Sequence, residues 1–150
     1  MGLIVYRDGG PYVLEASATV RYTPLKKWIE RGSGHHYEIK RLREAATMLT
    51  PEHVNALHQA GARFLGRSYD LTFDWSDDRM YCSELVYKIY DRALGVKIGE
   101  LQRVRDFDLT DVAVQTKMRE RYGSEVPLDA PVISPVAMKQ SPLLVTVTQK

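Results

Sequence analysis

The stretch from Cys82 to Leu94 constrains the fold more than any other part of the sequence. Apolar residues recur in it at helical spacing and form one wide stripe, which Gly95 ends. Because an apolar stripe of this width has to be buried, other elements must pack against that face of the helix. The members of the stripe are Leu85, Val86, Ile89, Tyr90, Ala93 and Leu94.

The N-terminal part of the chain carries strand and turn signals. Residues 3–6 and 12–14 are short apolar runs, and Asp8-Gly9-Gly10 between them supplies the positive-φ residues of a tight turn. We therefore predict a β-hairpin over residues 2–16. Residues 20–22 extend the same sheet, and residues 36–42 alternate polar and apolar as a half-exposed strand does.

Helix signals follow at three further places. Thr50-Pro51 begins a helix that Gly66 ends, because threonine caps the first turn and proline needs no hydrogen bond there. Shorter patterns predict helices over 23–29 and 111–122, and a strand over 143–148. Together the elements indicate an α+β fold of one domain, residues 1–150, with a small antiparallel sheet packed on the cysteine-bearing helix.

Composition excludes several classes of function. Lysine and arginine number 21 against 19 acidic residues and are interspersed with them, so no basic face for nucleic acid is expected. There is no apolar run of about 18 residues, and therefore no membrane span. The N-terminal residues also lack the pattern of an export signal. Since the chain has a single cysteine, an internal disulfide is excluded, and that thiol is either a packed core group or a reactive one.

Cys82 lies at the first turn of the strongest predicted helix. The unpaired amides and positive dipole end of such a turn stabilise a thiolate over a thiol. The same amides could donate hydrogen bonds to an oxyanion forming on an attacked carbonyl group. The alternative is a small buried hydrophobic residue, because free cysteine is among the most buried residue types.

The residues around Cys82 resemble a known family. Two segments match the pattern of NlpC-like cell-wall amidases: Gly66-Arg67-Ser68-Tyr69-Asp70 and Tyr81-Cys82-Ser83-Glu84-Leu85-Val86. Over nearly its whole length the chain is similar to the YiiX/YaeF group of permuted papain-like proteins. That similarity includes Pro11-Tyr12-Val13-Leu14-Glu15-Ala16, Tyr22-Thr23-Pro24-Leu25, Trp75-Ser76-Asp77-Asp78 and Glu120-Arg121-Tyr122-Gly123. In these proteins the histidine strand precedes the cysteine helix.

The resemblance implies roles for four residues. Cys82 matches the nucleophile, Glu15 the polar residue that orients the catalytic histidine, and Tyr69 and Tyr81 positions that line the cleft. A carboxylate in the apolar strand around Glu15 would also be costly to bury without a partner. The alternatives remain open: Glu15 could lie on the exposed face of an alternating strand, and tyrosines are more often core or rim residues than substrate contacts.

The family's catalytic histidine falls outside the match. It stands in a Ser/Asp-His-x-Gly stretch, and Met1 occupies the x position here, so the histidine would precede residue 1. The family's first strand, Gly-Asp-Ile/Leu, is missing as well, so we expect a shortened chain that is nearly inactive. His35, His36, His53 and His58 are expected to be solvated or locally hydrogen-bonded.

No cofactor and no metal site are expected, because one cysteine and scattered histidines form no ligand set. The aspartates at 74, 77 and 78 lack the glycine and the terminal glutamate of a calcium loop. We expect them instead to favour the start of the Cys82 helix.

The leading hypothesis is a cysteine amidase or peptidase acting on cell-wall peptide or lipid amide bonds, and whether this chain is itself an enzyme stays open. One alternative is a non-catalytic module that binds a peptide, an amino acid or an acyl chain on the same fold. Another is a structural domain in which Cys82 is inert and buried. The chain does not reveal its compartment; the resemblance implies the periplasm or cell envelope if an export signal lies upstream. An unpaired sheet edge would invite a homodimer.

Overall fold

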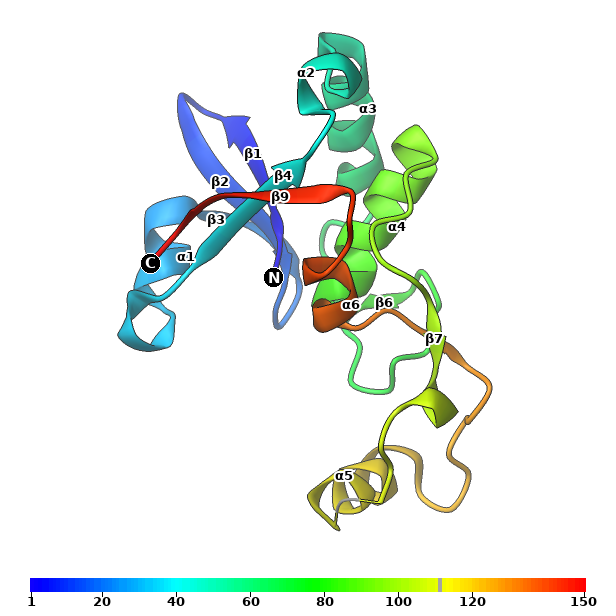
Figure 1. The fold of residues 1–150 in the computed structure, drawn as a ribbon. Coiled ribbons are helices and arrows are strands. Elements are labelled where there is room, and N and C mark those ends of the chain that lie inside the picture. Colours follow the sequence, from blue (N-terminus) through cyan, green and yellow to red (C-terminus); the bar gives the residue numbers. More distant parts are fainter. Residues whose placement is uncertain (111) are drawn as a thin grey trace.

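The first three strands and the helix of Cys82 form the framework of the structure, a computed structural model that describes residues 1–110 and 112–150 (Figure 1). In chain order the elements are β1 (Leu3–Arg7), β2 (Gly10–Ala16), β3 (Val20–Pro24), α1 (Leu25–Glu30), the 3₁₀ turn η1 (Ser33–His35), β4 (Glu38–Leu42), α2 (Ala45–Met48), α3 (Pro51–Ala62), β5 (Ser68–Tyr69), β6 (Arg79–Met80), α4 (Cys82–Leu94), β7 (Gln102–Arg103), the 3₁₀ turn η2 (Val104–Asp106), α5 (Val112–Tyr122), β8 (Pro131–Val132), α6 (Pro135–Lys139) and β9 (Leu144–Gln149). This mixture of helices and small sheets confirms the α+β class.

The predicted hairpin is confirmed. Strands β1 and β2 pair antiparallel with Leu3 opposite Leu14, and β3 adds to β2 in the order β1-β2-β3. Asp8 and Gly9 make the turn with positive φ angles of 50° and 79°. Glycine and aspartate are among the residues that such turns favour. Within the described residues β1 pairs only with β2, so its outer edge is open. Pairing of a second copy at that edge stays a prediction.

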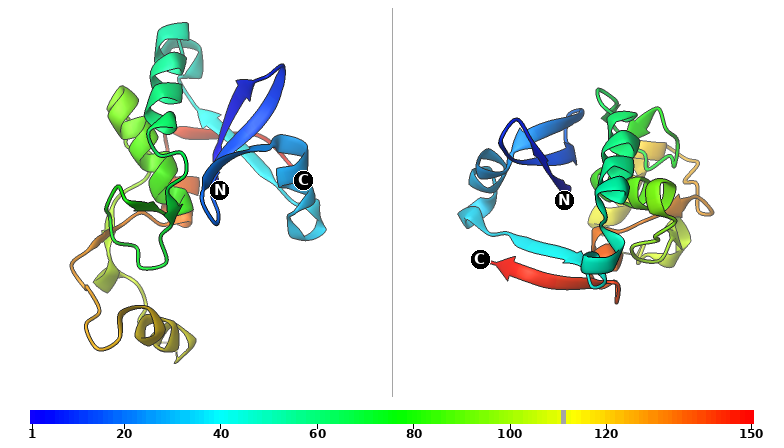
Figure 2. Two further views of the ribbon diagram at one scale, coloured as in Figure 1. Left: turned by 180° about the vertical axis from the view of Figure 1, so that it is seen from behind. Right: turned by 90° about the horizontal axis from the view of Figure 1, so that it is seen from above.

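The sheet packs on the cysteine-bearing helix through α3. Leu14 of β2 and Ile89 of α4 are fully buried, and both approach Gly61 of α3. A Cβ atom at Gly61 would lie 2.5 Å from Leu14 Cδ2 and 3.4 Å from Ile89 Cδ1, so a glycine lets the three elements meet closely. The left view of Figure 2 has α3 and α4 side by side next to the sheet.

The helix starts follow the local signals, whereas α3 ends at Ala62, before the predicted stop at Gly66. Thr50 Oγ1 accepts a hydrogen bond from the His53 amide at 3.2 Å, and Pro51 occupies the first turn of α3. Gly95 ends α4 in the left-handed region with φ of 67°. The predicted helix over 111–122 corresponds to α5, although its expected first residue, Asp111, lies outside the described residues.

A second, two-stranded sheet joins distant parts of the chain. Strand β4 pairs antiparallel with β9, so that Leu42 lies opposite Leu144. Both strands were predicted individually, but their partnership was not. This pair of strands runs from the side of the first sheet to the side of the helices (right view of Figure 2).

These three parts enclose a hollow of about 540 Å³. Its walls include Ile4 of β1, Ile39 of β4, Val147 of β9, and Val86 and Tyr90 of α4. The walls are largely apolar, and Cys82 is not among the residues that line it.

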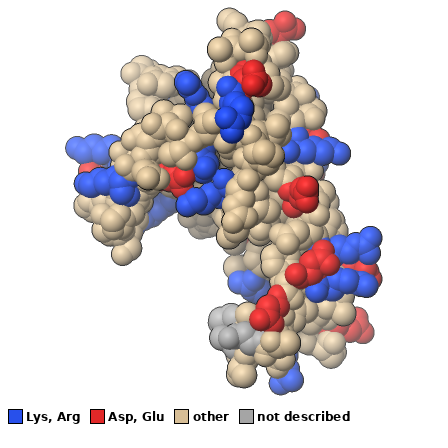
Figure 3. Space-filling model, in the orientation of Figure 1, with Lys and Arg blue, Asp and Glu red and all other residues tan. Residues whose placement is uncertain are grey.

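The surface carries mixed charge. On the face in Figure 3, basic side chains are scattered and many lie beside acidic ones. Among the described helices, none has both the length and the apolar character that a bilayer crossing requires.

Candidate functional site

Cys82 is the first residue of α4, as predicted. Tyr81 precedes it in an extended conformation, with φ of −96° and ψ of 165°, and the first helical hydrogen bond runs from the Leu85 amide to the Tyr81 carbonyl oxygen at 3.0 Å. The amides of residues 82–84 therefore precede the helical ladder and can serve other acceptors. Cys82 is a partly exposed residue and is not fully buried in the core.

The residues on either side of Cys82 fix the first turn to the strand β8 region. The Ser83 hydroxyl donates to the Ile133 carbonyl oxygen at 2.8 Å, and the Ile133 amide donates to the Tyr81 hydroxyl at 3.1 Å. Ser83 and Tyr81 are buried, and burial raises the pKa of the Tyr81 phenol. Tyr81 is thus a packed residue of this turn, and its contact with substrate stays a prediction.

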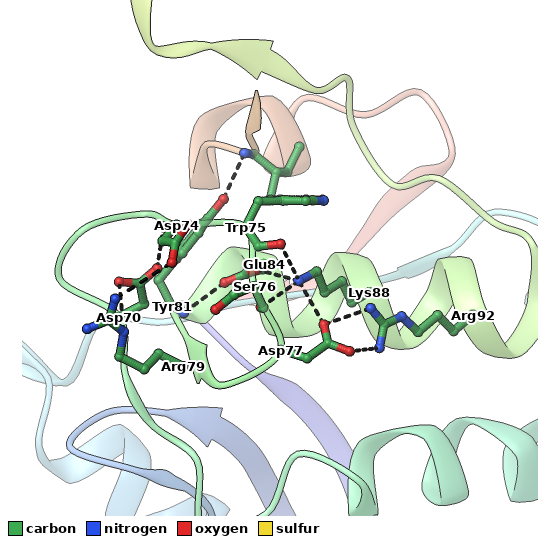
Figure 4. Close-up of polar contacts among 11 residues, drawn as sticks. Asp70, Asp74, Trp75, Ser76, Asp77, Arg79, Tyr81, Glu84, Lys88 and Arg92 are labelled. Atoms are coloured by element: carbon green, nitrogen blue, oxygen red, sulfur yellow. Dashed lines mark hydrogen bonds and ion pairs between the residues drawn. The ribbon is translucent and has the colours of Figure 1, made fainter. Parts of the chain in front are cut away.

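A buried lysine ties the same turn to the preceding loop (Figure 4). Lys88 Nζ lies 2.7 Å from Glu84 Oε1, and it donates to the Ser76 carbonyl oxygen at 2.8 Å and to Asp77 Oδ1 at 3.0 Å. Glu84 in turn accepts from the Tyr81 amide at 3.3 Å. Burial raises the pKa of Glu84 to about 7, although the hydrogen bond from Lys88 acts in the opposite direction.

Asp77 does not have the predicted role at the start of the Cys82 helix. It does not cap the start of α4, because its carboxylate instead binds side chains further along the helix. Arg92 donates two hydrogen bonds to it, at 2.6 and 2.8 Å, and Lys88 donates a third. The hydrogen bonds from Arg92 are the main reason why the pKa of Asp77 falls to about 2. The loop before Cys82 is therefore held along the side of α4.

Tyr69, a predicted cleft residue that is distant from Cys82 in the sequence, lies beside it in the structure. Strand β5 runs parallel to β6, with Tyr69 opposite Met80, two residues before the cysteine. Burial raises the pKa of the Tyr69 phenol, and its charge interaction and hydrogen bond with Cys82 raise it further. The phenol and the thiol are therefore neighbours.

Glu15 lies on β2 with its side chain 3% exposed. Its carboxylate accepts hydrogen bonds from Thr23 Oγ1 at 2.7 Å, from Trp28 Nε1 at 3.0 Å and from both terminal nitrogens of Arg31 at 3.0 and 2.5 Å. Burial alone would raise the pKa of Glu15, but these bonds outweigh it and the pKa is lowered. Glu15 is thus a buried, ionised group with several donors rather than an exposed one, and its role toward a histidine stays a prediction.

Residues 1–148 match the model of a family described as "Permuted papain-like amidase enzyme, YaeF/YiiX, C92 family". The chain belongs to this permuted papain-like amidase family. It is 45% identical over 149 residues to the uncharacterized protein YiiX of Escherichia coli strain K12, a match that covers 99% of this chain and 72% of that protein. The fold is similar, with a TM-score of 0.93, to a crystal structure described as the metalloprotein yiiX from Escherichia coli O157:H7. That similarity is at 45% identity and covers 99% of this chain and 81% of the other.

The relative in that crystal structure is described as a metalloprotein. Within residues 1–110 and 112–150, no three or more His, Cys, Asp or Glu side chains are grouped so that they could hold a metal ion.

The histidines do not supply an evident base for a C92-family cysteine. The Nδ1 atoms of His36 and His53 lie 3.1 Å from the Lys150 carbonyl oxygen and 2.6 Å from that of Met48, respectively. His58 instead lines a small hollow beside Val5 and Tyr22. Within residues 1–110 and 112–150, no hydrogen bond or ion pair joins a histidine to Cys82.

Proposed function

We propose that this chain carries the nucleophile of a cysteine amidase, with Cys82 attacking the carbonyl carbon of an amide or ester. The supporting observation is a partly exposed cysteine at the first residue of α4, beside amides that the helix does not use. Attack forms a bond between Sγ and the carbonyl carbon, and the bond to the leaving nitrogen then breaks. An imidazole takes the thiol proton and gives it to the leaving amine, and water later releases the acyl group.

The register of β1 and β2 supports a position for that imidazole. Leu3 lies opposite Leu14, so Gly2 lies opposite Glu15, and a Cβ atom at Gly2 would be 3.4 Å from the Cβ atom of Glu15. The position two residues before Gly2 is on the same face of the strand, because side chains alternate. A histidine there, where the family motif has one, would lie on the Glu15 side of the sheet.

Two consequences follow from this proposal. Glu15 would orient the histidine, and its bonds from Arg31, Thr23 and Trp28 would keep the carboxylate ionised for that purpose. Residues 1–150 without the histidine would turn over substrate slowly, since loss of a general base can cost on the order of a million-fold in a hydrolase.

The proposed substrates are cell-wall peptides or lipid amides, with Tyr69 lining the cleft beside the thiol. We propose a location in the periplasm or cell envelope, provided that an export signal precedes these residues. The family resemblance supports both proposals.

The apolar hollow favours a second candidate function. A cavity of about 540 Å³ away from Cys82 could hold an acyl chain or an apolar peptide without chemistry. In such a binding module, Cys82→Ser would leave ligand affinity unchanged, and no turnover would occur even when the histidine is present. Turnover that depends on Cys82 would argue against it.

The rate of alkylation by iodoacetamide near neutral pH tests the proposed nucleophile. Because Cys82 is the only cysteine of residues 1–150, thiol labelling within these residues reports on it, and the same polypeptide unfolded in urea supplies the reference rate. In a polypeptide that includes the preceding histidine, we expect the folded protein to react faster than the unfolded one, and His→Ala to slow it. A folded rate at or below the unfolded rate would refute the proposal.

A further inference from the structure

The last turn of α5 contacts the loop that leads to Cys82. The Arg121 guanidinium carbon lies over the Phe73 ring at 4.9 Å from its centroid. The Phe73 ring in turn meets the Tyr81 ring edge-on, with centroids 4.9 Å apart and an interplanar angle of 77°. Since Tyr81 directly precedes the cysteine, Arg121 is connected to the site by one edge-to-face aromatic pair.

Hydrogen bonds hold the loop that carries Phe73, the ring that Arg121 contacts. Buried Asp70 accepts hydrogen bonds from the Thr72 amide and hydroxyl, both at 2.8 Å, and from the Asp74 amide at 2.5 Å. The Tyr122 hydroxyl donates to the Thr72 carbonyl oxygen, which joins α5 to the same loop. The hydrogen bonds of Thr72 and Tyr122 therefore hold the adjacent residues Phe73 and Arg121 in place.

The charge of Arg121 is not used for an ion pair in the part of the chain that the structure describes. The nearby carboxylates of Asp70 and Asp74 lie 3.8 and 3.7 Å from Arg79 instead. The Arg121 charge nevertheless acts on Tyr69: burial raises the pKa of that phenol, and Arg121 opposes the rise. The same phenol also interacts with Cys82, so the charge of Arg121 and the thiol both act on Tyr69.

A guanidinium stacked on an aromatic face keeps its N–H edge free for a planar anion, which it can bind through two parallel hydrogen bonds. We propose that Arg121 binds a carboxylate of the substrate, so that the preferred amides are those of acidic amino acids or of peptides with a free carboxylate near the bond that Cys82 attacks. This inference rests on the proposed nucleophilic role of Cys82. It narrows the substrate class from amides in general to anionic amides.

Two alkylating reagents of matched size test the inference without a known substrate. Iodoacetate carries a carboxylate where iodoacetamide carries a neutral amide, and both react with the single thiol. The ratio of the iodoacetate rate to the iodoacetamide rate should fall about fivefold in Arg121→Met, the effect of one charge at a partly exposed site. In Arg121→Lys the rate ratio should fall less than in Arg121→Met. In Arg119→Met, an exposed control on the same helix, it should equal the wild-type ratio.

The outcomes separate this inference from the proposed function. If both reagents label Cys82 quickly but the ratio is the same in wild type and Arg121→Met, the carboxylate site is refuted while the nucleophile stands. If neither reagent reacts faster than it does with the unfolded chain, both proposals fail. The iodoacetamide rate also reports whether the variant keeps its folded site, and 1 M salt should reduce the wild-type ratio toward that of Arg121→Met.

Discussion

Replacing Lys88 by methionine should destabilise the protein strongly. The lysine side chain is 5% exposed, and it contributes the cation to a cluster with Glu84 and Asp77. Methionine has a similar length, so the substitution removes the charge and its hydrogen bonds with little change in packing volume. Glu84, which is fully buried, would then retain only the Tyr81 amide among the hydrogen-bond donors described for it.

The expected cost is about 3–5 kcal/mol at pH 8, the usual result of leaving one partner of a buried ion pair uncompensated. That is a large part of the 5–15 kcal/mol by which proteins of this kind are typically stable. The cost should be smaller at pH 5, because burial already raises the pKa of Glu84 to about 7 and the unpaired carboxyl can take up a proton.

Urea unfolding followed by circular dichroism measures this cost, and the chain offers a matched control. Lys26 and Glu30 form another lysine–glutamate pair four residues apart, but at 3.9 Å and with side chains 88% and 51% exposed. Lys26→Met should change the free energy of unfolding by less than about 0.5 kcal/mol. The double variant Glu84→Met/Lys88→Met should recover most of the loss. A Lys88→Met variant within about 1 kcal/mol of wild type at pH 8, the cost of an ordinary point mutation, would refute the reasoning.

Three further predictions follow from the same structure. The raised pKa of Glu84 contributes stability that is complete below about pH 4.5 and is lost as the pH rises through about 7, so the free energy of unfolding of wild type should fall by about 3 kcal/mol over that range. Glu84→Gln should lack this dependence on pH. Urea titrations from pH 5 to pH 8 in which both proteins lose stability equally would contradict the account. Arg31→Met should cost about 1–3 kcal/mol by removing two hydrogen bonds from buried Glu15, and an unchanged thermal midpoint would show that Thr23 and Trp28 suffice. Ser83→Ala should cost about 1–2 kcal/mol because the Ile133 carbonyl oxygen loses its donor, whereas no change in urea unfolding would mean that this bond does not hold the Cys82 turn.

Local signals in the sequence were enough to predict much of the fold. The Asp8-Gly9 turn, the Thr50-Pro51 helix start and the glycine at the end of α4 each act on neighbouring residues, and the structure confirms each of them. Cys82 at the first residue of its helix is another local feature, because the apolar stripe and the glycine that ends it bracket the helix.

What the sequence did not reveal depends on contacts between distant residues. Strand β4 pairs with β9 across about two thirds of the chain, and no local pattern selects that partner among several short strands. The buried position of Lys88 was equally hidden, since a lysine on a helix is usually solvated and only the returning loop around Asp77 covers it. A lysine at the edge of the wide apolar stripe, four residues after a glutamate, was the signal that could have indicated an internal ion pair.

Mass spectrometry of the acid-quenched protein tests most directly whether the Cys82 thiol attacks a carbonyl carbon. With p-nitrophenyl acetate as the probe, a polypeptide that contains these residues and the preceding histidine should give an initial burst of nitrophenol. The acetyl group should be found on Cys82 and should be absent from Cys82→Ser. An acetyl group found only on other residues, or a Cys82 that acquires it no faster than the urea-unfolded chain does, would contradict the account.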